Sequence, residues 1–415
     1  MSMKKLIFFF IIIFSLIYSN FSVLKSIILN KYPNIKLTKY LFKNDSLLNN
    51  INNDYNVKFL PETQFVKLNF FKKKLIFNKD YYTRGNEKKQ ISYSSWGTFF
   101  LELYKNKILI GDYLGNLYFI DNYSNFEKLQ NDINLNLINK NIKVDRLYDM
   151  LVHDESLYIS FGVEVNKCKI LYVSEAKINL KNLEFKNIFE VKSCDQTTSL
   201  GKIKKYNHFG KEGILLTTSS GIYNQPDNNP QKNDSIYGKI LFIDLENYKN
   251  YIFSKGHRII QGLFVDNEYI IATEHGPRGG DEVNKILFKK NYGWPIASYG
   301  EKYDFGYEKE PIYKKNHSEF DFEEPIFYFI PSIGISEIKK IDSNFSKFLS
   351  NKFIISSLNG RSLFFATFDN KYSSVKSIEK IFINQRIRDL EYDKDSKQIL
   401  LALEEDGEIG VIKAQ

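Results

Sequence analysis

Two glycine-rich turns within residues 273–295 carry the groups best suited to binding a cation. The first turn runs from Gly276 to Gly280 and is followed directly by Asp281 and Glu282. Because glycine has no Cβ atom, such a turn can bring backbone carbonyl oxygens close to a ligand. Carbonyl and carboxylate oxygens are the ligands that Ca²⁺ prefers. The residues alone leave two interpretations open, a Ca²⁺ site and a structural turn followed by exposed acids.

Residues 274–295 resemble, without a gap, the signature of the glucose/sorbosone dehydrogenase family, the soluble pyrroloquinoline quinone (PQQ)-dependent aldose sugar dehydrogenases. Members of this family are six-bladed β-propellers that bind PQQ and Ca²⁺ on one face. The resemblance implies that the carbonyl groups of Gly276 and Pro277 bind the Ca²⁺ beside PQQ. It also implies that Glu282 and the carbonyl group of Tyr292 bind a second, structural Ca²⁺.

Arginine is scarce in this chain, which has only seven arginines and otherwise uses lysine for positive charge. Arg386 and Arg388 lie two residues apart, so on a strand they would share one face. Their planar, forked side chains suit carboxylate groups, of which PQQ has three. By the resemblance, both arginines bind the PQQ carboxylates and Arg258 is a further cofactor contact. Without the resemblance, two exposed arginines on a strand would fit the sequence equally well.

The position of the catalytic base departs from the family. In the family, a histidine removes the hydroxyl proton while C1 of the sugar gives a hydride to PQQ, a role that suits imidazole near neutral pH. Residues 200–203 match the strand that follows this histidine, which places Thr198 at its position, and a threonine hydroxyl is a poor base. His208 is the fallback, although it follows the strand and is predicted to be a turn residue. The same kind of departure affects three further positions, namely Ile259, Asn359 and Ser219 or Ser220.

These residues predict an oxidoreductase that resembles the PQQ-dependent aldose dehydrogenases and acts on a sugar or a related polyol. The alternative is a catalytically degenerate propeller, stabilised by Ca²⁺, that serves as a binding module. A third hypothesis is an interaction protein in which the long insert at residues 299–329 faces a partner.

The region 91–413 predicts a scaffold of β-strands to position these groups. Short apolar runs alternate with polar or glycine-bearing turns, and no long stretch has the period of a helix. Six similar units of roughly 40–50 residues follow one another, which is typical of a β-propeller. In the fourth unit, strands are expected at 260–265, 269–273 and 283–288. A β-sandwich would show similar strands, and the family resemblance favours an all-β, six-bladed propeller.

The N-terminus predicts a location outside the cytoplasm, in the periplasm or its equivalent. Lys4 and Lys5 precede an apolar run at residues 6–18, as in a secretory signal. The uncharged stretch continues to Leu24 and approaches membrane-spanning length, so an uncleaved membrane anchor is equally open. Residues 1–24 are therefore expected to be a signal peptide or anchor, and residues 25–90 a linker and N-terminal extension with one or two strands.

The composition argues against a nucleic-acid partner. The formal net charge is +9, but the lysines are scattered and no basic stripe with interleaved aromatic residues occurs. Cys168 and Cys194 allow one disulfide or two free thiols. No Ser/His/Asp, HExxH or P-loop pattern is present.

Overall fold

The computed structural model describes residues 66–77, 98–121, 123, 132–139, 142, 144–166, 168–191, 201–220, 230–266, 269–301 and 313–414. Contacts divide the chain into Met1–Phe65 and Val66–Gln415, and only the second unit contains described residues. The expected signal peptide or anchor, Thr198, Cys194 and the side chain of Cys168 lie outside the described residues. Among the residues described, no helix is long and apolar enough to cross a membrane.

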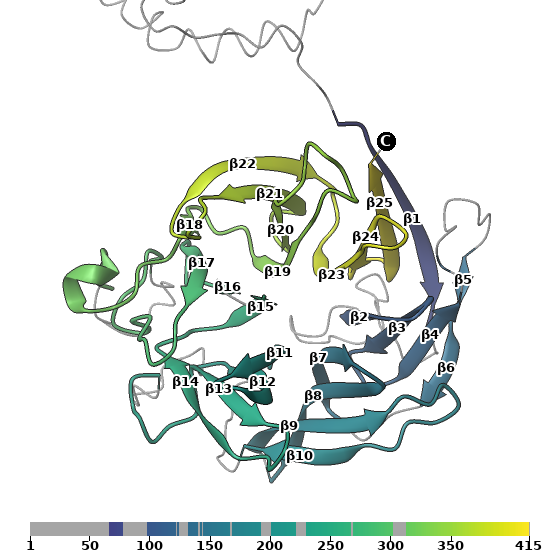
Figure 1. Ribbon diagram of the computed structural model, residues 1–415, viewed down its shortest axis with the longest axis horizontal. Helices are drawn as coiled ribbons and strands as arrows, with labels where there is room; N and C mark the ends of the chain where they lie inside the picture. The colour runs from purple at the N-terminus through teal and green to yellow at the C-terminus, as the bar shows by residue number, and fades with distance from the viewer. Residues whose placement is uncertain are drawn as a thin grey trace, which may run out of the picture. The chain divides into compact units, whose positions relative to one another are not determined.

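Six antiparallel sheets are arranged as blades around a central axis, as the view along that axis shows (Figure 1). From the inner to the outer edge, blade 1 consists of β2 (Phe99–Tyr104), β3 (Lys107–Asp112), β4 (Leu117–Asp121) and β6 (Asn136–Asn139). Blade 2 consists of β7 (Arg146–His153), β8 (Ser156–Val165), β9 (Cys168–Lys177) and β10 (Lys186–Glu190). Blade 3 consists of β11 (Ile203–His208), β12 (Lys211–Thr218), β13 (Lys239–Asp244) and β14 (Asn250–Lys255).

The remaining blades follow the same order. Blade 4 consists of β15 (Ile260–Val265), β16 (Ile270–Glu274), β17 (Asp281–Ile286) and β18 (Phe327–Phe329), with the 3₁₀ helix η2 (His317–Phe320) in the loop before β18. Blade 5 consists of β19 (Ile335–Lys340), β20 (Phe353–Ser357), β21 (Ser362–Phe368) and β22 (Val375–Phe382). Blade 6 consists of β23 (Ile387–Asp393), β24 (Gln398–Leu403), β25 (Glu408–Ala414) and β1 (Leu68–Ile76), which also pairs with β5 (Ile133–Asn134). The predicted all-β, six-bladed propeller is thus confirmed.

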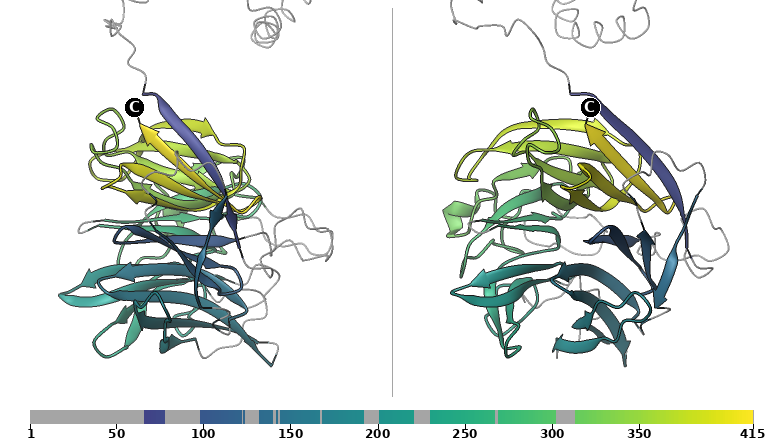
Figure 2. Two further views of the ribbon diagram at one scale, coloured as in Figure 1. Left: turned by 90° about the vertical axis from the view of Figure 1, so that its right-hand side faces the viewer. Right: turned by 45° about the vertical axis from the view of Figure 1, so that its right-hand side comes forward.

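Strand β1 closes the ring from the N-terminal side. It pairs antiparallel with β25, from Leu68 opposite Ala414 to Lys74 opposite Glu408, and lies along the outer edge of blade 6 (Figure 2). Of the one or two strands expected within residues 25–90, the described part contains a single continuous strand, β1. The propeller consequently includes residues upstream of position 91, where the sequence predicts its start.

In every blade the inner strand begins, and the second strand ends, at the same side of the ring. We call this side the site face and the opposite side the back face. In blade 4, Ile260 at the start of β15 pairs with Glu274 at the end of β16. In blade 6, Ile387 at the start of β23 pairs with Leu403 at the end of β24. Residues just before an inner strand and just after a second strand therefore gather on the site face.

Buried apolar clusters between neighbouring blades hold the ring together. Between blades 3 and 4, for example, Leu215, Phe242, Leu263 and Ala272 are almost completely buried. Strands covered on both faces need apolar residues at successive positions, and this explains the continuous apolar runs of the inner strands.

The inner strands also bring charged side chains into the centre of the ring. Lys202, just before β11, lies 2.6 Å from both Asp149 on β7 and Glu337 on β19, and 3.9 Å from Asp389 on β23. All four residues are buried, and this pairing satisfies charges that would otherwise be costly to bury. We refer to the centre of the ring as the channel and to these four residues as the channel cluster.

Candidate cation and cofactor site

A small cavity opens on the site face between the turn after β16 and the loop after β17. The volume of the cavity, taken as the space open to the centre of a water-sized sphere, is about 10 Å³. This is room for one water molecule or one ion. Its lining includes all four predicted metal-binding residues, namely Gly276, Pro277, Glu282 and Tyr292. The family resemblance implies that these four residues bind two different Ca²⁺ ions, whereas in the structure all four line one cavity.

The turn that forms one wall of the cavity requires its glycines. A Cβ atom on Gly276 would lie 2.1 Å from the carbonyl oxygen of Gly280. Gly280 has a φ of 69°, and a Cβ atom there would lie 2.2 Å from the amide nitrogen of Gly300. Both approaches are closer than any side chain allows. The glycines therefore let backbone segments of the turn and of the loop at Gly300 pack directly against one another.

Asp281 holds the turn in place. Its Oδ1 accepts a hydrogen bond from the Gly276 amide at 3.1 Å, and its Oδ2 accepts bonds from the amides of Ile333 and Ile335 in the next blade. Burial alone would raise the pKa of Asp281, but His275, the Ile335 amide and the Ser332 side chain hold it below its usual value. The residue was expected in a turn before a strand at 283–288, but it is the first residue of β17, because it pairs with Phe329 of β18.

The cavity is lined by two buried carboxyl groups, Glu274 and Glu282, that are suited to a cation. Burial and the neighbouring Glu274 raise the pKa of Glu282 well above its usual value. Asn284 donates to Glu282 at 3.2 Å, while its own Oδ1 has no hydrogen-bond partner within the described ranges. The same is true of His317 Nε2, which lies 3.8 Å from Glu282 Oε1. Buried polar atoms without partners are rare, and a cation would compensate the two carboxylates. The residues present therefore fit a bound cation.

Glu274 is held in place by a buried histidine. His257 Nδ1 lies 3.1 Å from Glu274 Oε2, and His257 Nε2 lies 2.8 Å from Ser254 Oγ. The order serine, histidine, carboxylate is that of a hydrolase triad. Ser254 and His257 are completely buried, however, so the serine cannot reach a substrate. The three residues instead position Glu274 at the cavity wall.

Arg258, a predicted cofactor contact, lies in the cavity wall. Its Nη1 donates to the carbonyl oxygens of His275 at 3.0 Å and Gly276 at 2.8 Å, and its guanidinium group lies 5.3 Å from the ring centre of Trp294. The Gly276 carbonyl thus already interacts with a cationic side chain. Since a carbonyl oxygen has two lone pairs, a second interaction with a metal ion remains available.

Arg386 and Arg388 converge on one buried carboxylate. Their Nε atoms donate to the two oxygens of Glu404, at 2.7 and 2.8 Å. Arg388 also donates to Gln261 Oε1 at 3.4 Å. Burial alone would raise the pKa of Glu404, but the two arginines hold it below its usual value. The two side chains share a face, as their spacing predicts, and they are partly exposed at the site face.

The sequence of the chain matches a known protein family over most of the propeller. A family model described as glucose/sorbosone dehydrogenase matches residues 140–411. The chain belongs to this family. Among its relatives, the aldose sugar dehydrogenase YliI of Escherichia coli is 28% identical over 231 residues, which is 50% of this chain and 60% of the relative. The chain spans less than two thirds of the length of the curated relatives that it matches.

Solved structures of family members show the same fold. The soluble aldose sugar dehydrogenase of E. coli in the apo-form matches with a TM-score of 0.64 and 20% identity, over 77% of this chain and 96% of that one. The PQQ-bound form of the aldose sugar dehydrogenase of Streptomyces coelicolor matches with a TM-score of 0.56 and 16% identity, over 77% and 94%. At these identities the likeness is one of architecture.

His208, the second candidate for the catalytic base, lies on the back face of this glucose/sorbosone dehydrogenase family member. It was predicted to be a turn residue but is the last residue of β11, because it pairs with Lys211 across the hairpin. Its ring packs among aromatic side chains, including Phe253 and Phe288, and its Nδ1 bonds the hydroxyl of Tyr251. Burial lowers its pKa. Because its strand begins on the site face, His208 lies at the wrong end of the blade to serve the cavity.

His275, which lies at the cavity, was assigned no catalytic role from the sequence. His275 lines the cavity, its side chain is 20% exposed, and its Nδ1 lies 3.7 Å from Asp281 Oδ1. Its position next to Gly276 was the available signal, but turn histidines that bond only to the backbone share that position. Of the other departures, Ile259 is buried and Ser220 Oγ accepts a hydrogen bond from Trp294 Nε1 at 2.7 Å.

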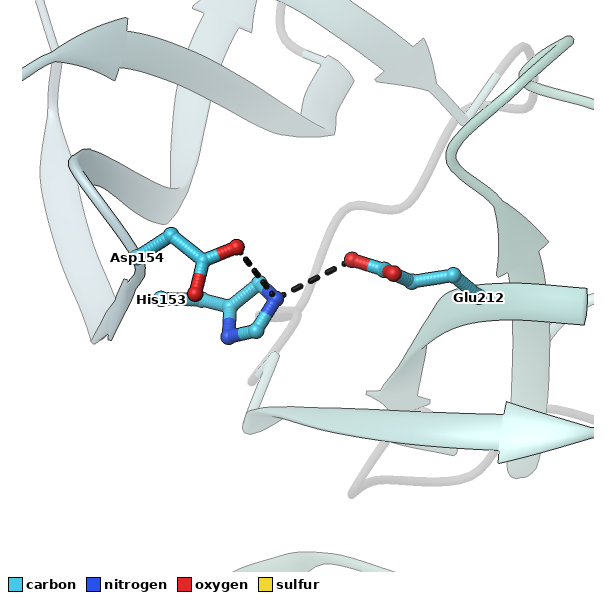
Figure 3. Close-up of side chains that lie close together, drawn as sticks. All are labelled: His153, Asp154 and Glu212. Carbon is cyan, nitrogen blue, oxygen red and sulfur yellow. Dashed lines mark hydrogen bonds and ion pairs between the residues drawn. The ribbon is translucent and has the colours of Figure 1, made fainter.

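A second group of potential metal ligands lies on the back face. His153 Nε2 faces Asp154 at 3.3 Å and Glu212 at 3.0 Å (Figure 3). Lys205 forms an ion pair with the same Glu212 oxygen, and its Nζ lies 2.6 Å from His153 Nε2. An ammonium group thus already occupies the position between the ligands. Asp154 is 81% exposed, and the group resembles a surface salt-bridge network more than a metal site.

Proposed function

We propose that the protein is an oxidoreductase of the PQQ-dependent aldose dehydrogenase type, acting outside the cytoplasm on a sugar or related polyol. The observation that carries this proposal is the convergence on one face of a cation cavity and three arginines, Arg258, Arg386 and Arg388. A planar cofactor with three carboxylates and a metal-bound quinone needs both features. Family membership and the signal-like N-terminus support the same assignment.

The residues available for the cofactors follow from this arrangement. Ca²⁺ would be held by the carbonyl groups of Gly276, Pro277 and Tyr292 with the carboxylate of Glu282. Because all four residues line one cavity, we propose a single Ca²⁺-binding site there. Arginine side chains would bind the carboxylates of PQQ. When bound, the metal-polarised quinone would supply the acceptor for the two electrons that leave C1 of the sugar as a hydride.

The proton of the sugar hydroxyl needs a base, and the five histidines of the chain can be compared directly. His153 and His208 end strands on the back face. His257 and His317 have side chains only 0% and 1% exposed. His275 alone lines the cavity with an accessible ring, and we assign it the role of base.

Asp281 supports this assignment by orienting the imidazole ring. A carboxylate beside Nδ1 fixes the ring and stabilises the imidazolium that forms when Nε2 takes up a proton. The separation of 3.7 Å exceeds a hydrogen bond. Catalytic hydrogen bonds are often long before substrate binds and shorten in the complex.

Titration of the Ca²⁺-loaded protein with PQQ in a calorimeter tests the cofactor proposal. We expect saturable 1:1 binding that requires Ca²⁺, followed by aldose-dependent reduction of an electron-accepting dye. Absence of PQQ binding by the folded, Ca²⁺-loaded protein would overturn the proposal.

A second candidate function is a Ca²⁺-stabilised binding module without catalysis. It is favoured by the family-specific departures at Thr198 and Asn359, which remove the usual base and a cofactor lysine. This candidate predicts that Ca²⁺ raises the melting temperature whereas PQQ does not change it. A PQQ-induced rise would exclude it.

A further inference from the structure

His317 directs a buried ring nitrogen at one of the proposed cation ligands and has no assigned role. It is the first residue of the 3₁₀ helix η2, in the long insert at residues 299–329. Its side chain is only 1% exposed, and its Nε2 lies 3.8 Å from Glu282 Oε1, too far for a hydrogen bond. Within the described ranges, Nε2 has no hydrogen-bond partner. Buried polar atoms in this state are rare and indicate a missing ligand or a functional role.

The other ring nitrogen of His317 determines what Nε2 can bind. Nδ1 lies 3.3 Å from the carbonyl oxygen of Glu323, and since a carbonyl group only accepts, Nδ1 must be the donor. In the neutral ring, Nε2 then carries a lone pair rather than a proton. Histidines that bind metal ions in proteins donate their second ring N–H to a carbonyl or carboxylate group in the same way. His317 is thus in the form that binds a metal ion through Nε2.

Aromatic stacking holds the imidazole ring in this orientation. The ring centre of His317 lies 5.2 Å from that of Tyr299, with 20° between the planes, and Tyr299 stacks in turn on Tyr328 at 3.8 Å and 5°. Tyr328 is the residue that pairs with Glu282 across β17 and β18. The stack therefore ties His317 to the strand pair that carries the carboxyl group. A donor atom that is fixed in advance costs less to order when an ion binds.

The carboxyl group of Glu282 leaves one oxygen to face His317. Asn284 donates from Nδ2 to the other oxygen, Oε2, at 3.2 Å, and no described group forms a hydrogen bond to Oε1. Two ligand atoms that each lie about 2.1 Å from one shared ion are roughly 3.0–4.2 Å apart, depending on the angle at the metal. The separation of 3.8 Å between Nε2 and Oε1 is within this range. One ion can therefore contact both atoms without any rearrangement.

We infer that His317 Nε2 and Glu282 Oε1 are ligands of one metal ion, and that the nitrogen lets this site bind a first-row divalent ion such as Zn²⁺ in addition to Ca²⁺. Ca²⁺ takes oxygen ligands, whereas Zn²⁺ is bound by imidazole nitrogen and carboxylate oxygen together. The insert would thus supply a metal ligand. The inference rests on the proposed function only in taking Glu282 as a cation ligand, and metal binding can be measured without PQQ.

Calorimetric titration of the chelator-treated protein with Zn²⁺ and, separately, with Ca²⁺ tests the inference by comparing the wild type with His317→Gln. Glutamine can still donate to the Glu323 carbonyl group, so the fold of the insert should be retained. We expect the substitution to weaken Zn²⁺ binding about 10-fold or more, because a nitrogen ligand is lost. Ca²⁺ affinity should change by less than about 3-fold, since Ca²⁺ relies on oxygen ligands.

His153→Gln is the matched control, because it removes an imidazole ring from the group of potential ligands on the back face. Its Zn²⁺ affinity should equal that of the wild type. Loss of Zn²⁺ binding in His153→Gln but not in His317→Gln would place the ion on the back face and overturn the inference.

Pulsed electron paramagnetic resonance of one equivalent of bound Cu²⁺ identifies the ligand even if His317→Gln does not fold, because it detects coupling to an imidazole nitrogen. The coupling should persist in the double variant His153→Gln/His275→Asn. His257 already bonds through both ring nitrogens, and His208 is enclosed by aromatic side chains on the back face. His317 is then the remaining source, and a folded double variant without nitrogen coupling would overturn the inference.

The remaining outcomes separate this inference from the proposed function. Equal Zn²⁺ affinities in the wild type and in a folded His317→Gln would overturn the inference and make the ring a structural contact of Glu282, as would a wild type that binds no Zn²⁺. Both results would leave the proposed function standing, because PQQ binding is measured with Ca²⁺. A protein that binds Zn²⁺ through His317 but never binds PQQ would overturn the proposed dehydrogenase and leave this inference intact.

Discussion

Glu274 and Glu282 lie on neighbouring strands of blade 4, paired directly across β16 and β17. Both are buried, and within the described ranges neither forms an ion pair with a lysine or arginine. Two like charges placed so close are unfavourable unless a positive charge lies between them. The pair therefore lowers the stability of the folded protein when no cation is bound. Carboxylates placed in this way are typical of binding sites.

The substitution Glu282→Gln should separate this binding role from a structural one. Without Ca²⁺ the variant should be at least as stable as the wild type, because a neutral amide replaces a buried carboxyl group whose ionised form is unfavourable there. Its Ca²⁺ affinity should fall about 10-fold or more, and the rise in melting temperature on adding Ca²⁺ should shrink accordingly. Differential scanning fluorimetry across a Ca²⁺ series measures both effects.

Glu301→Gln serves as the control for this experiment. Its side chain is 69% exposed and pairs with Lys315, so the Ca²⁺ response should match that of the wild type. An unchanged response in Glu282→Gln would place the ion, if any, elsewhere.

The assignment of His275 as the base predicts a specific kinetic defect. His275→Asn should lower turnover by about 10²–10⁴-fold, the usual contribution of general base catalysis, while PQQ affinity stays close to that of the wild type. Dye-reduction kinetics over a pH series would show the lost activity partly recovered at high pH, where hydroxide replaces the base. His153→Asn, on the back face, is the matched control, and equal turnover in both variants would contradict the assignment.

A site residue could be predicted from the sequence where its role follows from local backbone geometry. It could not be predicted where its role depends on packing between segments that are distant in sequence. The glycines of the turn could be identified because their spacing reflects local geometry. Arg386 and Arg388 could be paired because alternation along a strand is local as well. The contacts of Arg258 with the carbonyl groups of His275 and Gly276 could not be found in this way, because they depend on the pairing of β15 with β16 rather than on local spacing.

At the scale of elements, the sequence predicts three strands in each blade and misses the fourth. Inner strands are covered on both faces and read as apolar runs. The outermost strand of a blade is partly exposed, as in β22, where exposed lysine, serine and glutamate residues interrupt the apolar positions. Such polar strands resemble loops, and only pairing with the neighbouring strand defines them.

Strand β1 allows a direct test of how much the closing element contributes. Leu75 is 3% exposed and packs into the cluster between blades 6 and 1, whereas its neighbour Ile76 is 46% exposed. Leu75→Ala should reduce the free energy of unfolding by about 2–5 kcal/mol. Ile76→Ala should cost less than about 1 kcal/mol. Urea denaturation measures both, and equal costs would show that β1 contributes little to the closed ring.

At the scale of the whole molecule, the charged channel should make stability depend on pH. Burial and the nearby Glu391 raise the pKa of Glu102 from 4.5 to about 8. Between these values the folded state binds a proton that the unfolded state does not. The contribution of this group is therefore fully present below its unfolded pKa and is lost as the pH rises through the window.

Glu102→Gln should flatten this decline. Glutamine keeps an acceptor for the Val152 amide, which lies 3.3 Å from Glu102 Oε2. Relative to the wild type, the variant should therefore gain stability between pH 5 and pH 8. Thermal melts across this range test the prediction, with the exposed Glu246→Gln as the control. A pH slope equal to that of the wild type would show that Glu102 does not titrate in this window.

The direction of β1 determines on which face the described chain enters the ring. Leu68 pairs with Ala414, and β25 runs away from the cavity, so β1 begins on the back face. The strand that completes blade 6 therefore enters from the side opposite the cavity, and its first residues do not obstruct the approach of a small molecule to Arg386 and Arg388.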